Sequence, residues 1–343
     1  MYKIAFIYGH TLVYWSSVVV ALGAFTGILF FWAAYSRRPD SVLGAAFVCP
    51  LSVILSLILA RLIYWYFRTD SYESLFAAMT DYSHTGFALA GAFAGCLLAA
   101  GFLRLVKVVK NLPFLLDCMS IGGCAAVSIG RLSCFFTSDD RGAILSGVTK
   151  LPWVFPVMNS TSGLLEYRFA AFLFQAIAAG CIFVVLLFVF RAARHRDGDI
   201  ALLFLLFYCA SQIVLESTRY DSLRLRVNGF ISIVQVLCAL ALVFVVSVFL
   251  VRYQKKTGWR FWHPALWLLL ASALGGAGYM EYHVQRHGNQ AFFSYLVMSG
   301  CLALIVTLGV VLWCLSKRGK CQEQSTGETA RESLMRGCQE EDE

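Results

Sequence analysis

Nine apolar runs divide most of the chain, and each has the roughly 20 residues that a helix needs to cross the hydrocarbon core of a bilayer. A transmembrane barrel would instead show stretches of about 10 residues with alternating polarity, whereas these runs are unbroken. The pattern predicts an all-α, polytopic membrane helix bundle. The nine predicted spans lie near residues 11–35, 42–67, 86–107, 113–136, 167–191, 199–217, 228–252, 264–280 and 293–316.

The composition supports this class and excludes others. Hydrophobic residues make up 59% of the 343 positions and charged residues 14%, whereas soluble domains carry about 25% charged residues. So few charges cannot cover a water-facing surface, which excludes a soluble enzyme, a disordered protein and a secreted disulfide scaffold. The twelve cysteines show no C-x-x-C and no Cys/His metal spacing, so no metal or other cofactor is expected.

Basic residues are distributed unevenly between the two sets of connecting segments. One alternate set holds 17 of the 28 Lys and Arg residues and the other holds nine, while Arg61 and Arg131 lie inside spans. Cytoplasmic loops are enriched in Lys and Arg, so the bias predicts an N-terminus outside and a C-terminus in the cytoplasm. The net charge of +8 therefore concerns membrane orientation and indicates no nucleic-acid partner.

Three parts are predicted along the chain. Residues 1–255 form a seven-span core with a small external arm at about 137–166. Residues 256–318 form an appended transmembrane helical pair, whose spans contain almost no polar side chains. The segment 317–343 begins basic and ends in four acidic residues, and we expect residues 319–343 to form a disordered cytoplasmic tail.

Ionisable residues inside the predicted spans are few, and each costs about 2.5–3.5 kcal/mol even on the lenient insertion scale. Arg61, Arg131 and Glu216 lie near the outer ends of three spans, and His84 lies at the mouth of a fourth. We expect these four groups to meet in one pocket near the outer headgroups. Asp117, at the opposite end of its span, is interpreted as a helix-start or packing residue.

A polar stripe marks the sixth span, where Tyr208, Gln212, Glu216 and Arg219 share one face at i, i+4, i+8 and i+11. Arginines at headgroup depth suit a phosphate, because guanidinium binds phosphate bidentately and stays charged. A carboxylate and an imidazole beside them can move a proton. The residues therefore predict a site for an anionic lipid headgroup, although a structural ion-pair network or snorkelling of single arginines would also place charges there.

Several short blocks, in their order along the chain, resemble the prolipoprotein diacylglyceryl transferases, a family of seven-helix bacterial inner-membrane enzymes. The resemblance covers about residues 10–252, and the family topology is the one predicted from the basic residues. Its most specific block is G-R-L-S-C-F at 130–135, followed by Gly142. Weaker blocks are L-A-R-L-I-Y at 59–64, H-T-G at 84–86, L-F-Q-A at 173–176, the stripe from Tyr208 to Arg219, and I-S-I-V-Q at 231–235.

Departures from the family pattern leave a second interpretation open. The family stretch H-P-[ST]-Q-L-Y-E is F-A-A-F-L-F-Q at 169–175, so its His and Glu are absent, and Gln212 stands where the family has an arginine. The last two spans have no family counterpart. The alternative is a catalytically degenerate paralogue that binds an anionic lipid or lipopeptide without transfer. A transporter or channel is disfavoured, because the membrane midplane lacks charge and no discontinuous helix pair is evident.

The resemblance implies a reaction and its partners. The family moves the diacylglyceryl group of phosphatidylglycerol onto the lipobox cysteine thiol of prolipoproteins, at the outer face of the bacterial cell (inner) membrane, and glycerol phosphate leaves. The expected partners are therefore phosphatidylglycerol, prolipoprotein lipobox segments and membrane lipid.

The resemblance also implies roles for particular residues. Arg61 and Arg131 would bind the headgroup phosphate, and Gly142 and Tyr208 would belong to the same substrate site. Arg219, beside Glu216, would assist the leaving group. His84 or Glu216 would be the base that takes the thiol proton, and His84 is favoured because a histidine with an ordinary pKa of about 6.5 is mostly neutral at pH 7.

Overall fold

The chain is described by a computed structural model in which helices dominate. The helices are α1 (Trp15–Tyr35), α2 (Val42–Phe67), α3 (Leu75–Thr80), α4 (Leu89–Leu105), α5 (Leu112–Gly130), the 3₁₀-helix η2 (Arg131–Phe135), α6 (Ala171–Ala192), α7 (Asp199–Ser217), α8 (Ile233–Thr257), α9 (His263–His287) and α10 (Ala291–Glu340). The structure describes residues 4–8, 11–38, 42–67, 72, 74–80, 86–137, 140–144, 151, 153–158, 163–192, 195–225, 229–287 and 290–340.

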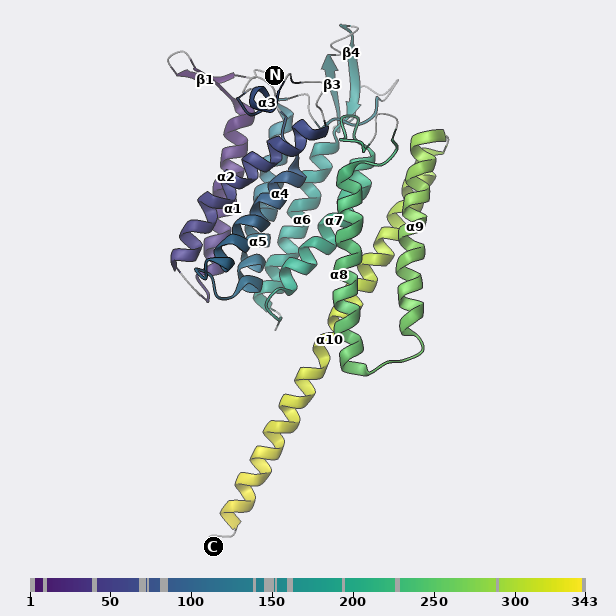
Figure 1. Cartoon of the computed structure of the whole chain (residues 1–343). Helices are drawn as coiled ribbons and strands as arrows, with labels where there is room; N and C mark the ends of the chain where they lie inside the picture. The colour runs from purple at the N-terminus through teal and green to yellow at the C-terminus, as the bar shows by residue number, and fades with distance from the viewer. Residues whose placement is uncertain are drawn as a thin grey trace.

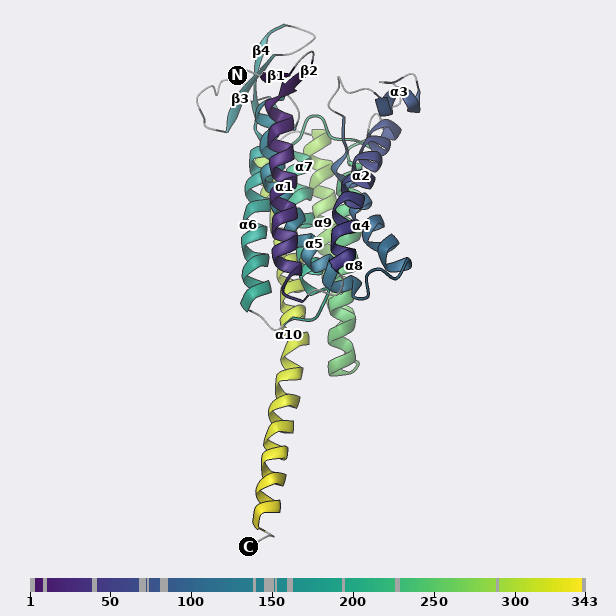
Figure 2. The ribbon, with the colours of Figure 1, turned by 90° about the vertical axis from the view of Figure 1, so that its left-hand side faces the viewer.

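Two antiparallel hairpins accompany the helices. β1 (Ile4–Tyr8) pairs with β2 (Thr11–Tyr14), and β3 (Val154–Met158) pairs with β4 (Leu165–Phe169). Both hairpins and α3 lie at one end of the bundle (Figures 1 and 2), which we call the hairpin end. The first predicted span was placed too early, because residues 11–14 pair as a strand and the helix begins at Trp15.

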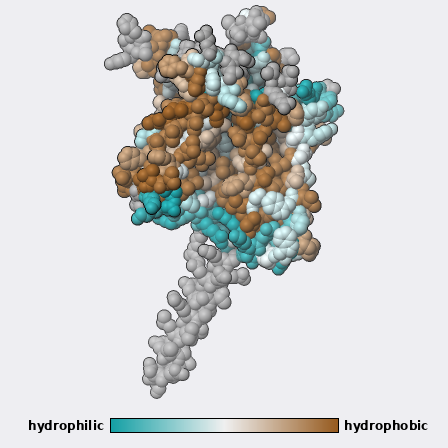
Figure 3. Space-filling model, viewed as in Figure 1, coloured by the Kyte–Doolittle hydropathy of each residue, from teal (hydrophilic) through white to brown (hydrophobic). Residues whose placement is uncertain are grey.

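A polytopic membrane helix bundle is confirmed as the fold class. Within the described ranges, seven helices are long and apolar enough to cross a membrane, namely α1, α2, α5 with η2, α6, α7, α8 and α10. The two other predicted spans also contain helices, but α4 has only 17 residues and α9 does not meet the same criterion. In Figure 3 a brown hydrophobic band covers the bundle, with teal hydrophilic residues gathered below it, as expected for a surface that faces lipid.

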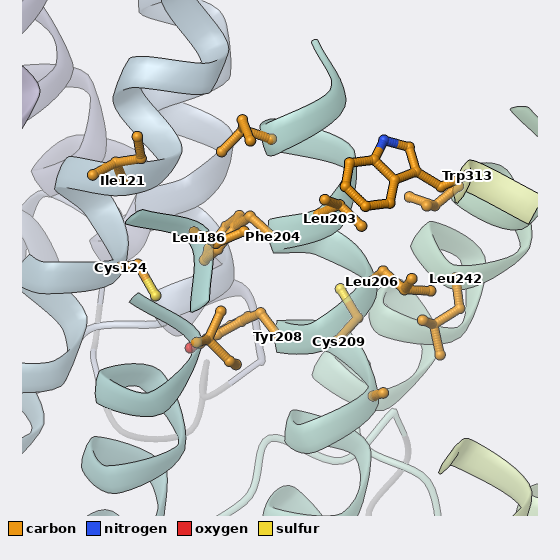
Figure 4. Packing of buried hydrophobic residues seen from close by; sticks show 14 of the residues in the cluster. Ile121, Cys124, Leu186, Leu203, Phe204, Leu206, Tyr208, Cys209, Leu242 and Trp313 are labelled. Atoms are coloured by element: carbon orange, nitrogen blue, oxygen red, sulfur yellow. The ribbon is translucent and has the colours of Figure 1, made fainter. Parts of the chain in front are cut away.

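Helix α7 lies at the centre of the bundle, in contact with α5, α6, α8 and α10. Apolar side chains from these helices meet around it in Figure 4, where Leu203 and Phe204 of α7 lie among Leu186 of α6, Leu242 of α8 and Trp313 of α10. Because α7 is surrounded by other helices, its polar stripe faces protein and not lipid.

Helices α2 and α4 form a close pair beside this core. The sequence Gly91-x-x-x-Gly95 lets the two backbones approach, because a Cβ at Gly95 would lie 2.4 Å from the Ser56 nitrogen. Ser56 Oγ adds a hydrogen bond to the Ala92 carbonyl at 2.8 Å. The ring of Phe93 then joins the pair to α7 through Tyr208, with ring centroids 5.4 Å apart.

The C-terminal helices pack directly on the core. Helix α10 contacts α7, α8 and α9, and Trp313 Nε1 donates to Asp199 Oδ2 at the start of α7 over 3.0 Å. Asp199 also receives a hydrogen bond from Arg252 Nη1 of α8 at 2.6 Å. The predicted division into core, appended pair and disordered tail stays a prediction, although α10 continues as one helix to Glu340.

Asp117 holds the start of α7 from the neighbouring helix α5. Its two carboxylate oxygens accept the backbone N–H groups of Gly198, at 2.7 Å, and Ala201, at 2.8 Å. The side chain is fully buried, and it satisfies two of the amides that every helix start leaves without an intrahelical partner. The interpretation of Asp117 as a residue that serves a helix start is therefore supported, but the helix is α7 and not its own.

Replacing Asp117 by alanine should destabilise the fold. The Asp117→Ala variant leaves two buried N–H groups without acceptors, and we expect a loss of about 1–3 kcal/mol. Thermal unfolding in detergent measures this loss. The matched control is Asp197→Ala, which removes a nearby, more exposed carboxylate that pairs with Arg38 and accepts a side-chain hydrogen bond from Asn111 but caps no buried backbone amide among the described residues, and it should cost less. Equal unfolding temperatures for the two variants would contradict the capping role.

Candidate functional site

A chain of alternating arginines and carboxylates lies at the hairpin end of α7. Asp140 pairs with Arg131 through Oδ2 and with Arg219 through Oδ1. Arg219 also contacts Glu216, with Nη1 3.0 Å from Oε2, and Asp221, with Nη2 3.1 Å from Oδ1. We call these five residues the ion-pair network. It joins the end of α5 to the end of α7 through a loop residue.

Gly142 lets the loop that carries Asp140 lie against the end of α7. Gly142 forms an antiparallel bridge with Arg219, and its N–H donates to the Phe169 carbonyl of β4 at 2.7 Å. A Cβ at this position would lie 2.8 Å from the Thr218 carbonyl oxygen, so any larger residue would push Asp140 away from Arg219. The structure gives Gly142 a role in backbone packing, and its place in a substrate site stays a prediction.

Arg141, next to Asp140, anchors the same loop from the other side. Its Nη2 donates to the carbonyl oxygens of Cys134, at 3.0 Å, and Thr137, at 3.1 Å. Its guanidinium lies over the rings of Phe172, 4.6 Å from the centroid, and Phe155, 5.3 Å away. Such cation–π contacts stabilise a buried cation. Arg141 thus fixes the backbone around Asp140.

The charges around Asp140 keep its carboxyl ionised. Burial alone would raise the pKa of Asp140, but the neighbouring guanidinium groups of Arg131 and Arg219 and a hydrogen bond from Cys134 lower that pKa to about 2. The three carboxylates of the network in turn raise the pKa of Arg219, against the opposing effect of burial. Both guanidinium groups are therefore already neutralised by carboxylates within the protein.

Three buried donors beside the network have no hydrogen-bond partner among the described residues. They are Arg131 Nε, Tyr208 Oη and Gln212 Nε2. Tyr208 and Arg131 interact electrostatically, and Gln212 follows Tyr208 by one turn on the same face of α7. Leaving a buried donor unpaired costs about 1–3 kcal/mol. The donors therefore mark a place that suits an anion or another acceptor.

Two departures from the family pattern meet in space. Gln175 of α6 donates from Nε2 to Gln212 Oε1 of α7 at 3.3 Å, and both side chains are buried. These are the positions where the resembled family has a glutamate and an arginine. A glutamate and an arginine are thus replaced here by a pair of amides, so that neither substitution leaves a buried charge without a partner.

Arg61 is buried in the α2–α4 pair. Its Nε donates to the Ala78 carbonyl at 2.7 Å and its Nη1 to the Gly86 carbonyl at 2.8 Å. Its guanidinium carbon lies 5.2 Å from the centroid of the Phe87 ring. These contacts hold α3 and residues 86–87 against α2. His84 lies outside the described residues, so its expected meeting with Arg131 and Glu216 stays a prediction, as does that of Arg61.

The structure therefore brings together five of the seven predicted site residues and adds others. Arg131, Glu216 and Arg219 share the ion-pair network, Gly142 supports it, and Tyr208 lies beside Arg131. Sequence reasoning had assigned no role to Asp140, Arg141, Gln175 and Asp221. Asp140 was visible only as one of two adjacent aspartates after the G-R-L-S-C-F block, and nothing in the sequence indicated which would turn inward.

Comparisons with known proteins agree on one family. The family model described as "Prolipoprotein diacylglyceryl transferase" matches residues 3–250. A phosphatidylglycerol–prolipoprotein diacylglyceryl transferase of Lactococcus lactis is 28% identical over 271 residues, covering 74% of this chain and 95% of its own. The corresponding protein of Clostridium kluyveri is 24% identical over 264 residues, with 76% and 99% covered. That of Thermotoga petrophila is 30% identical over 210 residues, with 60% and 69% covered.

Stability should depend on pH through Asp140. Because the pKa of Asp140 is lowered to about 2 from an ordinary value near 3.9, its pairing contributes on the order of 2 kcal/mol above about pH 4 and is lost as the pH falls toward 2. We expect the Asp140→Asn variant to unfold at a lower temperature at pH 7. Its unfolding temperature should also change less than that of the unmodified protein between pH 4.5 and 2.5, as measured by thermal scans. The control Asp221→Asn removes a more exposed carboxylate and should cost less.

Gln175 and Gln212 should tolerate charged replacements only when both residues are changed together. Gln175→Glu or Gln212→Arg alone introduces an uncompensated charge at a buried position, and each should cost several kcal/mol. The double variant Gln175→Glu/Gln212→Arg places an ion pair there and should recover much of that loss, as a double-mutant cycle of thermal stabilities can measure. A double variant that is as unstable as the sum of the singles would show that the two side chains are not coupled.

Proposed function

This chain belongs to the prolipoprotein diacylglyceryl transferase family, and from that premise we propose that it transfers the diacylglyceryl group of phosphatidylglycerol to the lipobox cysteine thiol of prolipoproteins. The reaction would take place at the outer face of the bacterial cell membrane, where the predicted orientation puts the hairpin end. The nearly complete cover of the Lactococcus lactis and Clostridium kluyveri relatives supports a full-length transferase core.

The unpaired donors carry this proposal. Arg131 Nε, Tyr208 Oη and Gln212 Nε2 are buried donors without acceptors among the described residues, and the oxygens of a lipid phosphate are strong acceptors. A phosphate bound there would lie beside Arg131, with Arg219 close by through Asp140. A site that only held the helices together would have no reason to leave three donors open.

The reaction requires a base for the thiol and cations that stabilise the departing phosphate. The thiolate sulfur attacks the glyceryl carbon next to the phosphate, a C–S bond forms, the C–O bond breaks, and glycerol phosphate leaves with the electron pair. A free cysteine has a pKa near 8.5, so a base must take the thiol proton. We assign the role of this base to His84 or Glu216. Arg131 and Arg219 would stabilise the departing phosphate.

Residues of the network, rather than arginines in general, should be needed for transfer. Purified full-length protein is incubated with phosphatidylglycerol and a lipobox peptide, and the diacylglyceryl adduct is followed by mass. Arg131→Ala should lower the rate of adduct formation by at least about a hundredfold, since removal of one preorganised donor at a reacting group costs that much. The control Arg38→Ala alters a largely exposed arginine and should keep the rate.

Two results would contradict the proposal in different ways. Full activity of Arg131→Ala would remove the assignment of Arg131. Binding of phosphatidylglycerol by the unmodified protein without any adduct would instead favour the degenerate paralogue, which holds the lipid but does not transfer its diacylglyceryl group.

A further inference from the structure

A small polar pocket adjoins the ion-pair network between the hairpin ends of α7, α8 and α9. Its lining comprises Glu216 and Arg219 of the network, Glu281 and Gln285 of α9, Ser232 and Gln235 at the start of α8, and Ser222, Arg224 and Phe230 from the segment between α7 and α8. The space has room for about one water-sized group. Helix α9 therefore reaches the same site as residues of the polar stripe on α7.

Glu281 is the residue that suggests a ligand in this pocket. Its side chain is buried, with 4% of the residue exposed. One carboxylate oxygen, Oε1, accepts a hydrogen bond from Gln285 Nε2 at 3.2 Å. The other, Oε2, is buried and makes no direct hydrogen bond among the described residues, although Ser217, Gln235 and Arg224 lie near enough to interact with the carboxyl group. A buried carboxylate oxygen without a donor is costly, so the pocket suits a group that donates a hydrogen bond.

The position of Glu281 is fixed by contacts to the helix that carries Glu216. Gln285 Nε2 donates to the Ser217 carbonyl at 3.3 Å, and Tyr295 Oη of α10 donates to the same carbonyl at 3.4 Å. Ser217 is the last residue of α7 and the neighbour of Glu216. The family model ends at residue 250, so these contacts bring residues from beyond the matched region to the edge of the proposed active site.

We propose that Glu281 accepts a hydrogen bond from a free hydroxyl of the glycerol headgroup, which makes α9 part of the substrate site. This inference rests on the proposed function, because it takes the lipid phosphate to lie at Arg131 and Arg219. Arg219 belongs to the network and also lines the pocket. A glycerol attached to a phosphate at Arg219 would therefore lie next to the pocket that holds Glu281. A hydroxyl matches the pocket, which has room for about one water-sized group, whereas a second phosphate is too large for it.

The consequence is selection of the headgroup that leaves. The phosphate would be held by donors of α5 and α7, and the far end of the glycerol by a carboxylate of α9. A site built to bind a hydroxyl rejects an analogue that lacks it, because the buried acceptor is then left unpaired. The C-terminal helices would thus contribute to lipid specificity as well as to packing.

The test compares two lipids that differ only in these hydroxyls. Adduct formation on a lipobox peptide is measured with phosphatidylglycerol and with phosphatidylpropanol, whose three-carbon headgroup has no free hydroxyl. The unmodified protein should prefer phosphatidylglycerol by at least about tenfold in kcat/KM. Glu281→Leu should lose that preference by slowing the phosphatidylglycerol reaction and leaving the phosphatidylpropanol reaction unchanged. Glu281→Gln, which retains an acceptor and the contact to Gln285, should keep part of the preference.

The controls separate a specific role from a structural one. Tyr279→Phe changes an exposed residue of the same helix and should leave both rates unchanged. If Glu281→Leu and Glu281→Gln slow both lipids equally, or alter neither, Glu281 does not recognise the headgroup. A stronger response to phosphatidylethanolamine than to phosphatidylglycerol would mean that an ammonium group occupies the pocket, and would also overturn the assignment.

Failure of the proposed transfer can be told apart from failure of this inference. If the unmodified protein forms no adduct with any lipid, binding of the two lipids is measured by native mass spectrometry on the same variants. A preference for phosphatidylglycerol that disappears in Glu281→Leu would then support the hydroxyl site while the transfer proposal fails. Equal binding of both lipids by the unmodified protein would overturn the hydroxyl site.

Discussion

The double ion pair of Asp140 with Arg131 and Arg219 is the interaction on which the site depends. Each of the two arginines belongs to a different helix end, and neither could be buried at the hairpin end without a carboxylate. One loop carboxylate pairs with both and thereby ties the end of α5 to the end of α7. Gly142 and Arg141 serve this contact, the first by leaving room and the second by anchoring the loop.

This arrangement changes how the arginines would act on a phosphate. The sequence suggested cations free to bind an anion, but carboxylates already pair with the guanidinium groups of Arg131 and Arg219. What remains open are directed donors, Arg131 Nε, Tyr208 Oη and Gln212 Nε2. A preorganised set of donors can stabilise developing charge without reorganising at the moment of reaction, so these donors suit a leaving phosphate.

Much of the fold could be predicted from the sequence, because the bilayer imposes span lengths that appear directly as apolar runs. The stripe on α7 was predictable as well, since helical spacing places residues on one face. Asp140 was not, because its inward position depends on a loop that only tertiary contacts define. The contact of Gln175 with Gln212 was equally hidden, as the two departures lie on different helices. Glu281 lay just beyond a predicted span, with nothing in sequence to connect it to Glu216.

The coupling between Arg131 and Asp140 during diacylglyceryl transfer tests the central claim most directly. Rates of adduct formation with phosphatidylglycerol and a lipobox peptide are measured for Arg131→Gln, Asp140→Asn and the double variant. If one network holds the leaving phosphate, each single change should slow transfer strongly and the double variant should be little slower than the worse single variant. Losses that simply multiply in the double variant would show that the two residues act independently, and would contradict the account.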